Sequence, residues 1–233
     1  MPQRRVIIPE IGEVVLAKRR GARNLRLSIT AKGEVRVSMP SWTPYVAGIS
    51  FAKSRSDWIL QHLERIRPLL LREGMLIGKA HRLHFRPTAS PEVRTRVTLS
   101  SIEVSTGLAP EDAKVQSKAA IAAERALRAE AGRLLPQRLR VLADQHGYSY
   151  REVRIRKLTS RWGSCSHRKT ITLSYYLMQL PWPLIDYVLL HELVHTEHLN
   201  HGADFWAAFE ESLPGAKILR KQIRAYNPRL VPS

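Results

Sequence analysis

The sequence has 233 residues, of which 44% are hydrophobic and 25% are charged, as is usual for a globular chain that buries a core. No stretch approaches the roughly 20 consecutive apolar residues of a membrane span, and a single cysteine, Cys165, excludes an internal disulfide and favours the cytoplasm. The formal net charge of +18 would attract polyanions such as nucleic acid. Because the basic residues are spread along the chain, this charge equally fits a generally basic composition.

The N-terminal part is patterned as β-strands. Its opening stretch, MPQRRVIIPEIGEVVL, has a basic start but only a brief apolar run, so we expect it to begin the fold rather than act as a signal peptide. Apolar residues alternate on both sides of Gly33 over residues 25–39, which predicts a hairpin. Thr43 and Pro44 are then suited to a helix N-cap and a first helical position, and helical periodicity continues to residue 66.

The middle of the chain changes in composition near residue 111. Before this point, alternating patterns predict short strands around residues 81–85, 93–99 and 102–104. After it, an Ala-, Leu- and Arg-rich stretch predicts a long helix that kinks at Pro136 and ends at Gly147. We therefore divide the chain into a β-rich region, 1–110, and a second domain, 111–233.

The C-terminal part contains an unusual concentration of histidine. Strands are predicted over 152–158 and 170–178, with the loop TSRWGSCSHRK between them. A proline-flanked helix start, PWP, then leads into LLHELVHTEHLNHGADFW over residues 189–206, which holds four histidines. The apolar residues around HELVH predict a largely buried helix.

The pattern HELVH is typical of a zinc-dependent hydrolase. His191 and His195 are four residues apart, so a helix presents both imidazoles on one face, where they make half of a tetrahedral zinc site. Glu192 adjoins the first ligand and can reach a water on the metal without occupying a coordination position. Zinc lowers the pKa of such a water to about 7, so that a carboxylate can take its proton.

The third ligand is expected downstream of this pair. His198 would lie about 10 Å along a straight helix from the first histidine, so three ligands on one helix would converge poorly. A helix break at residues 199–200, where Asn tolerates a left-handed backbone, would bring His201 back toward the metal. We therefore select His201, with Glu210 and Glu211 as weaker alternatives.

These motifs together resemble a known family. RWGSC, TITLSYYLMQLP, IDYVLLHELVH and HLNHGADFW are similar to the YgjP-like metallopeptidases, relatives of the SprT-like zinc proteases, densely over residues 150–225 and more loosely toward the N-terminus. The resemblance implies an α+β fold, in which an N-terminal β-rich hairpin and helix region precedes a zincin-like catalytic domain with an HExxH active-site helix. It also implies one zinc ion held by His191, His195 and His201, with Glu192 as general base.

Several residues around the motif are candidates for substrate binding. Arg161 could stabilise an oxyanion or hold a carboxylate or phosphate, Trp162 could wall the cleft, and Tyr187 could donate a hydrogen bond, although each residue also fits a packing or surface position. The strand over 170–178 is the candidate to pair with an extended peptide. Within it, Ser174 stands where the family is expected to carry asparagine, which puts a substrate contact from this position in doubt.

Other residues near the motif are expected to support it. Asp204 is a candidate acceptor for the second N–H group of a ligating histidine. We expect His198 to be exposed, and Cys165 to be a buried, inert thiol rather than a residue near the site. We expect Phe205 and Trp206 to pack the following helix against the catalytic one.

The favoured function is therefore that of a cytoplasmic zinc metallopeptidase acting on peptides or proteins. The basic surface and the SprT-like kinship add a weaker hypothesis, that the substrates lie on nucleic acid, which the basic surface would bind nonspecifically. One alternative is a metal-dependent hydrolase of nucleotide phosphoanhydrides, although no Gly-rich phosphate loop is present. Another is a basic, nucleic-acid-associated binding protein with a structural zinc, a site that would need four protein ligands and no Glu192.

Overall fold

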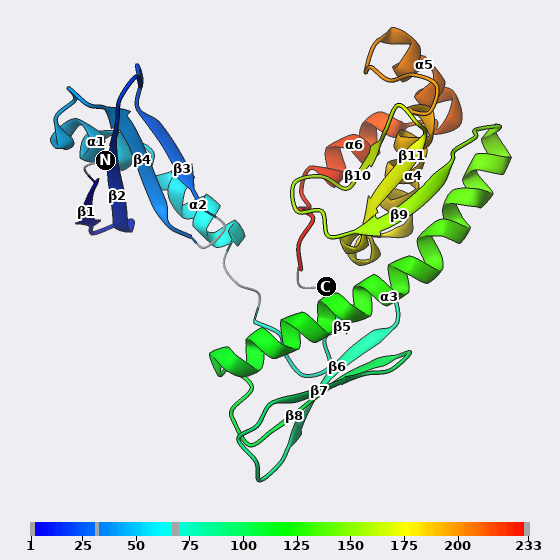
Figure 1. The fold of residues 1–233 in the computed structure, drawn as a ribbon, viewed down its shortest axis with the longest axis horizontal. Coiled ribbons are helices and arrows are strands. Elements are labelled where there is room, and N and C mark those ends of the chain that lie inside the picture. Colours follow the sequence, from blue (N-terminus) through cyan, green and yellow to red (C-terminus); the bar gives the residue numbers. More distant parts are fainter. Residues whose placement is uncertain (1–2, 31–32, 67–69, 231–233) are drawn as a thin grey trace. The chain divides into compact units, whose positions relative to one another are not determined.

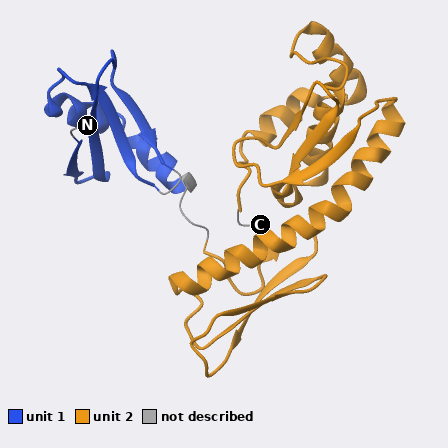
Figure 2. Cartoon of the chain, viewed as in Figure 1, with its two compact units in different colours: residues 1–68 blue, residues 69–233 orange. Residues whose placement is uncertain are grey.

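The computed structural model describes residues 3–30, 33–66 and 70–230. The chain divides into two compact units, residues 1–68 and 69–233 (Figure 2). The change in composition near residue 111 marks the start of a helix within the second unit and not the boundary between the units. The reason is that this helix packs on the strands that precede it, so the two cannot be separated.

The first unit is a mixed sheet with two helices. Its strands are in the order β1-β2-β4-β3, and its elements are β1 Gln3–Ile8, β2 Gly12–Arg19, β3 Arg26–Ile29, β4 Val35–Pro40, α1 Tyr45–Lys53 and α2 Ser56–Ile66. The predicted hairpin is confirmed, because β3 pairs antiparallel with β4 and Ile29 lies opposite Val35. The alternate residues Val35, Val37 and Met39 are buried, as the period-two pattern indicated.

The single helical pattern predicted after this hairpin forms two helices. The Ser54 hydroxyl donates to the Phe51 carbonyl at 3.0 Å, so a side chain competes for backbone groups where the first helix ends. Pro44 occupies the N-cap position, without a side-chain cap, so the prediction of Thr43 as N-cap was wrong. Thr43 is instead buried.

The second unit begins with another four-stranded sheet followed by a long helix. The strands, in the order β5-β6-β8-β7, are β5 Leu76–Ile77, β6 His81–Pro87, β7 Arg94–Val97 and β8 Ser101–Thr106. The three longer strands confirm the predictions, and β5 is too short to leave a periodic signal. The helix α3, Ala113–His146, is capped by the Asp112 side chain and ends at Gly147 with φ 74°. It continues through Pro136 as one helix.

The second half of this unit packs on the opposite side of α3. A three-stranded sheet in the order β10-β11-β9 is followed by helical elements: β9 Glu152–Arg156, β10 Gly163–Cys165, β11 Thr170–Ser174, the 3₁₀-helix η1 Tyr175–Gln179, α4 Trp182–Val194, α5 Ala203–Ser212 and α6 Ala216–Ile223. In Figure 1, α3 runs between the β5–β8 sheet and this second layer. One hydrophobic core joins the two layers, and the fold is therefore mixed α+β.

The strand predicted over residues 170–178 is shorter and placed differently. The Ser174 hydroxyl accepts a hydrogen bond from the Tyr176 backbone N–H, which starts η1 and ends β11. Because β11 lies between β10 and β9, both of its edges are already paired. The prediction that this strand pairs with a peptide was therefore wrong, and β10 and β9 are the strands at the two edges of the sheet. No helix among the described residues is long and apolar enough to cross a membrane.

Candidate metal centre

The helix α4 carries the HELVH motif through the core. Leu184, Ile185, Leu189 and Leu193 are buried along it, which fixes its rotation and directs the two histidines toward a common point. The helix ends at Val194, earlier than the predicted break at residues 199–200. The expected left-handed backbone at Asn200 was also wrong, because among the described non-glycine residues only Lys169 has a positive φ.

Three imidazoles converge after this early helix end. The Nε2 atoms of His191 and His195 are 3.2 Å apart, and each lies 3.1 Å from Nε2 of His201. Nitrogen ligands at 2.0–2.1 Å around a tetrahedral zinc lie about 3.3 Å from one another. A neutral imidazole carries one N–H, so three ring nitrogens cannot all satisfy one another with mutual hydrogen bonds. The donor set and its spacing fit a cation such as zinc.

The second nitrogen of each ring has a different environment. Nδ1 of His195 lies 2.9 Å from the backbone carbonyl of His198, which favours an N–H at Nδ1 and a lone pair at Nε2. The proposed acceptor, Asp204, is exposed and makes no hydrogen bond to a described histidine, so a backbone carbonyl takes the role expected of its carboxylate. His198 is partly buried rather than exposed. Nδ1 of His191 is buried without a partner among the described residues.

The helix α5 covers the imidazoles with aromatic side chains. Phe205 is fully buried, and its ring centroid lies 5.0 Å from that of His191, 4.6 Å from that of His195 and 4.7 Å from that of His201. The Trp206 indole N–H donates to the His201 backbone carbonyl at 3.1 Å. The predicted packing role of both aromatic residues is confirmed, and they also hold His201 against the other two rings.

The weaker ligand candidates lie outside this cluster. Among the described residues, the group of side chains that could share a metal ion contains only the three histidines. Glu210 and Glu211 are both exposed, and Glu210 instead accepts a hydrogen bond from the Gly215 backbone N–H at 2.9 Å.

Glu192 lies beside the histidine cluster and packs against β10 at Gly163, a residue without a side chain. Only 5% of Glu192 is exposed. A Cβ atom on Gly163 of β10 would lie 2.6 Å from Glu192 Oε1 and 2.8 Å from its Cγ, so only glycine leaves room for the carboxylate. Sequence reasoning missed Gly163, although a glycine within a short strand is itself a signal of close approach.

The electrostatics of the site follow from burial. Burial raises the pKa of Glu192 to about 8, although the Arg161 guanidinium opposes this shift. Burial, with smaller contributions from His195, His201 and Arg220, lowers the pKa of His191 to about 3. Burial also lowers the pKa of His195. The two helix histidines are therefore neutral near pH 7, which is the form that binds a metal.

Two pockets flank the Glu192 carboxylate. The first, about 270 Å³, is lined by the three histidines and Glu192 on one side and by Arg161 and β10 on the other. The second, about 250 Å³, is bordered by Trp162, Tyr187 and Ile223, together with Arg161. The three predicted substrate-binding residues therefore all lie beside Glu192, with Arg161 common to both pockets.

Two of the neighbouring residues, Tyr187 and Cys165, are protonated near neutral pH. Tyr187 is buried and makes no hydrogen bond with a described residue, and burial raises its pKa even though Arg220 and Arg224 oppose the shift. Cys165 is only partly buried on β10 and lines the first pocket, so the prediction of a buried thiol away from the site was wrong. Burial, with a contribution from Glu192, raises the pKa of its thiol to about 11, so the thiolate is scarce near neutral pH, as expected of an unreactive cysteine.

The chain is similar to known metallopeptidases. A family model described as YgjP-like, metallopeptidase domain, matches residues 23–226. Among solved structures, the metallopeptidase zymogen of Pyrococcus abyssi abylysin is 31% identical over 40% of this chain and 93% of its own, with a TM-score of 0.37. The metallopeptidase zymogen of Methanocaldococcus jannaschii jannalysin is 21% identical over 37% of this chain and 90% of its own, with a TM-score of 0.34. No curated protein gives a significant match.

Proposed function

The chain belongs to the YgjP-like metallopeptidase family, and we propose that it hydrolyses peptide bonds with one zinc ion held by His191, His195 and His201. The observation that supports this ligand set is the approach of the three Nε2 atoms to within 3.1–3.2 Å of one another. Three protein ligands leave a coordination position open, as in catalytic zinc sites, whereas structural sites are usually closed by four. This count argues against a purely structural zinc.

Glu192 is the proposed general base. When bound, zinc would supply Lewis acidity to the attacking water and to the peptide carbonyl. The Glu192 carboxylate would take the proton of the attacking water and return it to the nitrogen of the leaving amine. The Glu192 carboxylate lines both pockets beside the ligand His191, a position from which it can reach the attacking water and the leaving nitrogen. Arg161 would hold the carbonyl oxygen of the substrate, and Trp162 and Tyr187 would contact a substrate side chain in the second pocket.

The free edge of β10 is the proposed binding place of the peptide backbone. Two backbone hydrogen bonds set the phase of the β10–β11 ladder: Ser174 N–H to Trp162 C=O at 2.8 Å, and Ser166 N–H to Thr170 C=O at 3.0 Å. In an antiparallel ladder the intervening odd residues face outward, so the N–H and C=O groups of Gly163 and Cys165 point away from β11. An extended substrate can pair with them and pass directly beside Glu192.

Compartment and nucleic-acid binding are weaker parts of the proposal. The single cysteine favours the cytoplasm. The net charge of +18 supports a nonspecific attraction of nucleic acid, which would decline steeply between low and physiological salt.

The first test is zinc content per chain by plasma mass spectrometry, in the native protein and in His201→Ala. We expect about one zinc in the native protein and a sharp loss in the variant, because two imidazoles hold zinc much more weakly than three. His198→Ala is the matched control, since His198 contributes only its backbone carbonyl. Full zinc retention in His201→Ala would contradict the ligand set. Peptide and nucleoside triphosphate panels on the same preparations would separate the peptidase from the phosphoanhydride alternative.

A further inference from the structure

A third and larger pocket lies on the outer face of the β10-β11-β9 sheet. It adjoins the first of the two pockets beside Glu192, which we call the catalytic pockets. It has a volume of about 570 Å³, and we name it the arginine pocket because it is lined by Arg151, Arg154, Arg161 and Arg168 together with Glu152, Ser164, Cys165, Ser166, Thr170 and Thr172. Three of its lining residues, Arg161, Ser164 and Cys165, also line the first catalytic pocket, so the two concavities are adjacent.

The arginine pocket has more positive charge than its own residues neutralise. Glu152 is its one acidic residue and pairs with Arg154 at 2.5 Å. The side chains of Arg151, Arg161 and Arg168 make no hydrogen bond or ion pair with a described residue. Four guanidinium groups facing one carboxylate leave an excess of positive charge with unused N–H donors, which is the arrangement that recognises a carboxylate or a phosphate.

The floor of the arginine pocket runs in register toward the free edge of β10. Arg154, Thr172 and Ser164 lie directly opposite one another across the three strands, so their side chains stand on one face of the sheet. Gly163 and Cys165 alternate with Ser164, and Gly163 contacts Glu192 on the other face. In a peptide paired with β10, alternate side chains would therefore point toward the arginine pocket.

We infer that the arginine pocket is a substrate subsite that takes an acidic side chain of the peptide, Asp or Glu, close to the bond that is cleaved. This inference rests on the proposed peptidase function and adds its specificity. The bound carboxylate would accept hydrogen bonds from guanidinium groups and from the hydroxyl groups of the floor. A peptide whose acidic residue lies one position out of register would direct it to the opposite face and lose the contact.

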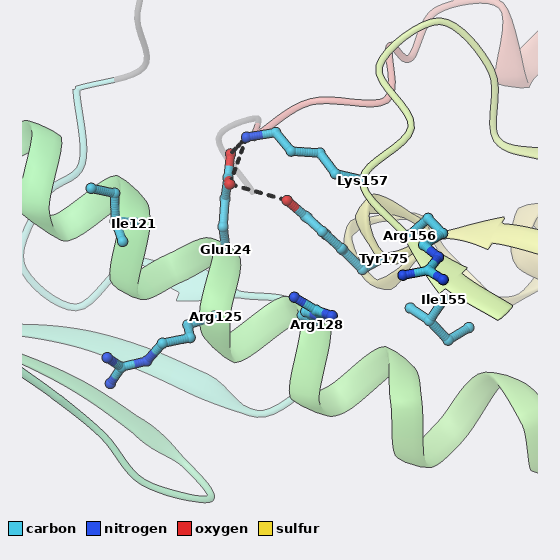
Figure 3. Close-up of a pocket in the computed structure, with 8 residues that line it drawn as sticks. All are labelled: Ile121, Glu124, Arg125, Arg128, Ile155, Arg156, Lys157 and Tyr175. Atoms are coloured by element: carbon cyan, nitrogen blue, oxygen red, sulfur yellow. Dashed lines mark hydrogen bonds and ion pairs between the residues drawn. The ribbon is translucent and has the colours of Figure 1, made fainter.

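A second basic pocket supplies the control. Its volume is about 400 Å³, and Arg125, Arg128, Arg156 and Lys157 line it together with Glu124 (Figure 3). It shares no lining residue with either catalytic pocket. In Figure 3 the side chain of Arg125 points away from Glu124. Removing a charge here lowers the net charge as much as in the arginine pocket, without touching the cleft.

The test uses the zinc-loaded full chain and pairs of peptides that differ only by Asp against Asn, with the Asp walked through each position near the cleavage site. We expect kcat/KM to favour the Asp peptide by roughly tenfold at one position, as one charge-assisted contact provides. Arg168→Gln and Arg151→Gln should lower this ratio several-fold, Arg168→Lys should restore part of it, and Arg125→Gln should leave it unchanged. A ratio near one at every position, or an equal fall in Arg125→Gln, would overturn the inference.

Binding separates this inference from the proposed function. Fluorescence anisotropy of the same peptides with Glu192→Gln reports recognition without hydrolysis. If the native protein cleaves neither peptide but Glu192→Gln binds the Asp peptide more tightly, through Arg168, the peptidase proposal fails and the acidic subsite stands. If a single-stranded oligonucleotide displaces the peptide with a steep salt dependence and binds more tightly than it, the pocket is a polyanion site and the inference is overturned.

Discussion

Two glutamates of the second unit show how one residue type serves two purposes. Glu124 on α3 accepts hydrogen bonds from Lys157 at 2.7 Å and Tyr175 at 3.0 Å (Figure 3). It also accepts one from Tyr176 at 2.6 Å. Burial alone would raise its pKa, but these donors outweigh burial and lower it. Glu192 on α4 is more deeply buried and has no hydrogen bond from a described residue, and its pKa is raised to about 8.

The difference indicates which carboxylate stabilises the fold and which is available for chemistry. Leaving a buried charged group without donors costs free energy, and protein structures retain such a group mainly where a reaction needs it. The bonds of Glu124 connect α3 to η1 and to the residue after β9, so its charge joins the layers of the fold. Glu192 instead packs against Gly163 of β10, which leaves room for the carboxylate but offers no side chain to bond it.

The largest expected effect is that of Glu192→Gln. Replacing the carboxylate removes the proton acceptor, so kcat should fall about 10²–10⁴-fold, while zinc content and peptide binding persist. Because the lost carboxylate accepts no hydrogen bond from a described residue, the free energy of unfolding should stay the same or increase. Peptide hydrolysis assays measure kcat, and denaturant unfolding of the same preparation measures the free energy of unfolding. A variant that loses stability but keeps its kcat would reverse the roles assigned to the two glutamates.

Gly163→Ala should give the next largest effect. The added Cβ lies where the Glu192 carboxylate now sits, so the carboxylate moves, and a displacement of about 1 Å in a catalytic group can cost 10²-fold in rate. The loss should fall on kcat, with zinc retained. Gly132→Ala is the matched control, because nothing lies within 4 Å of a Cβ there and alanine favours the helix. Unchanged kcat in Gly163→Ala would show that the position of Glu192 is not restricted by β10.

The sequence was sufficient for the local chemistry of the site and insufficient for its surroundings. The four-residue spacing of His191 and His195 requires only a helix. The long helix could be predicted from its composition, and the hairpin and the longer strands β6, β7 and β8 from periodicity. The helix end after Val194 could not be predicted from the sequence. The chain turns there with the His198 backbone carbonyl beside Nδ1 of His195, and not through a left-handed residue at Asn200.

Strand order was a further limit of the sequence. Periodicity shows that residues 170–174 form a strand but not that β9 and β10 cover its two edges. The edge at which we propose that the peptide binds is the three-residue strand β10, which is too short to produce a periodic pattern. The contact between Gly163 and Glu192 joins residues 29 positions apart, and only the folded packing brings them together.

Glu124→Gln should give the smallest effect, and on stability alone. The amide keeps the shape but loses the charge that binds Lys157, and because that lysine is about half exposed we expect a loss of about 1–2 kcal/mol with kcat nearly unchanged. Urea unfolding at pH 7 measures the loss. Glu211→Gln, at an exposed glutamate without a described partner, is the control and should change stability by less than about 0.5 kcal/mol.

The pH dependence of this difference distinguishes a bonded carboxylate from an unbonded one. The pKa of Glu124 in the folded chain is lower than its ordinary value of 4.5, so its ionised form stabilises the fold fully above pH 4.5, and this contribution is lost as the pH falls through the folded pKa. The stability difference between the native protein and Glu124→Gln should therefore be constant near neutral pH and shrink below pH 4.5. Losses of stability that both proteins share, including protonation of zinc ligands, cancel in the difference. A difference that persists undiminished at pH 3 would mean that the charge of Glu124 does not account for its contribution to stability.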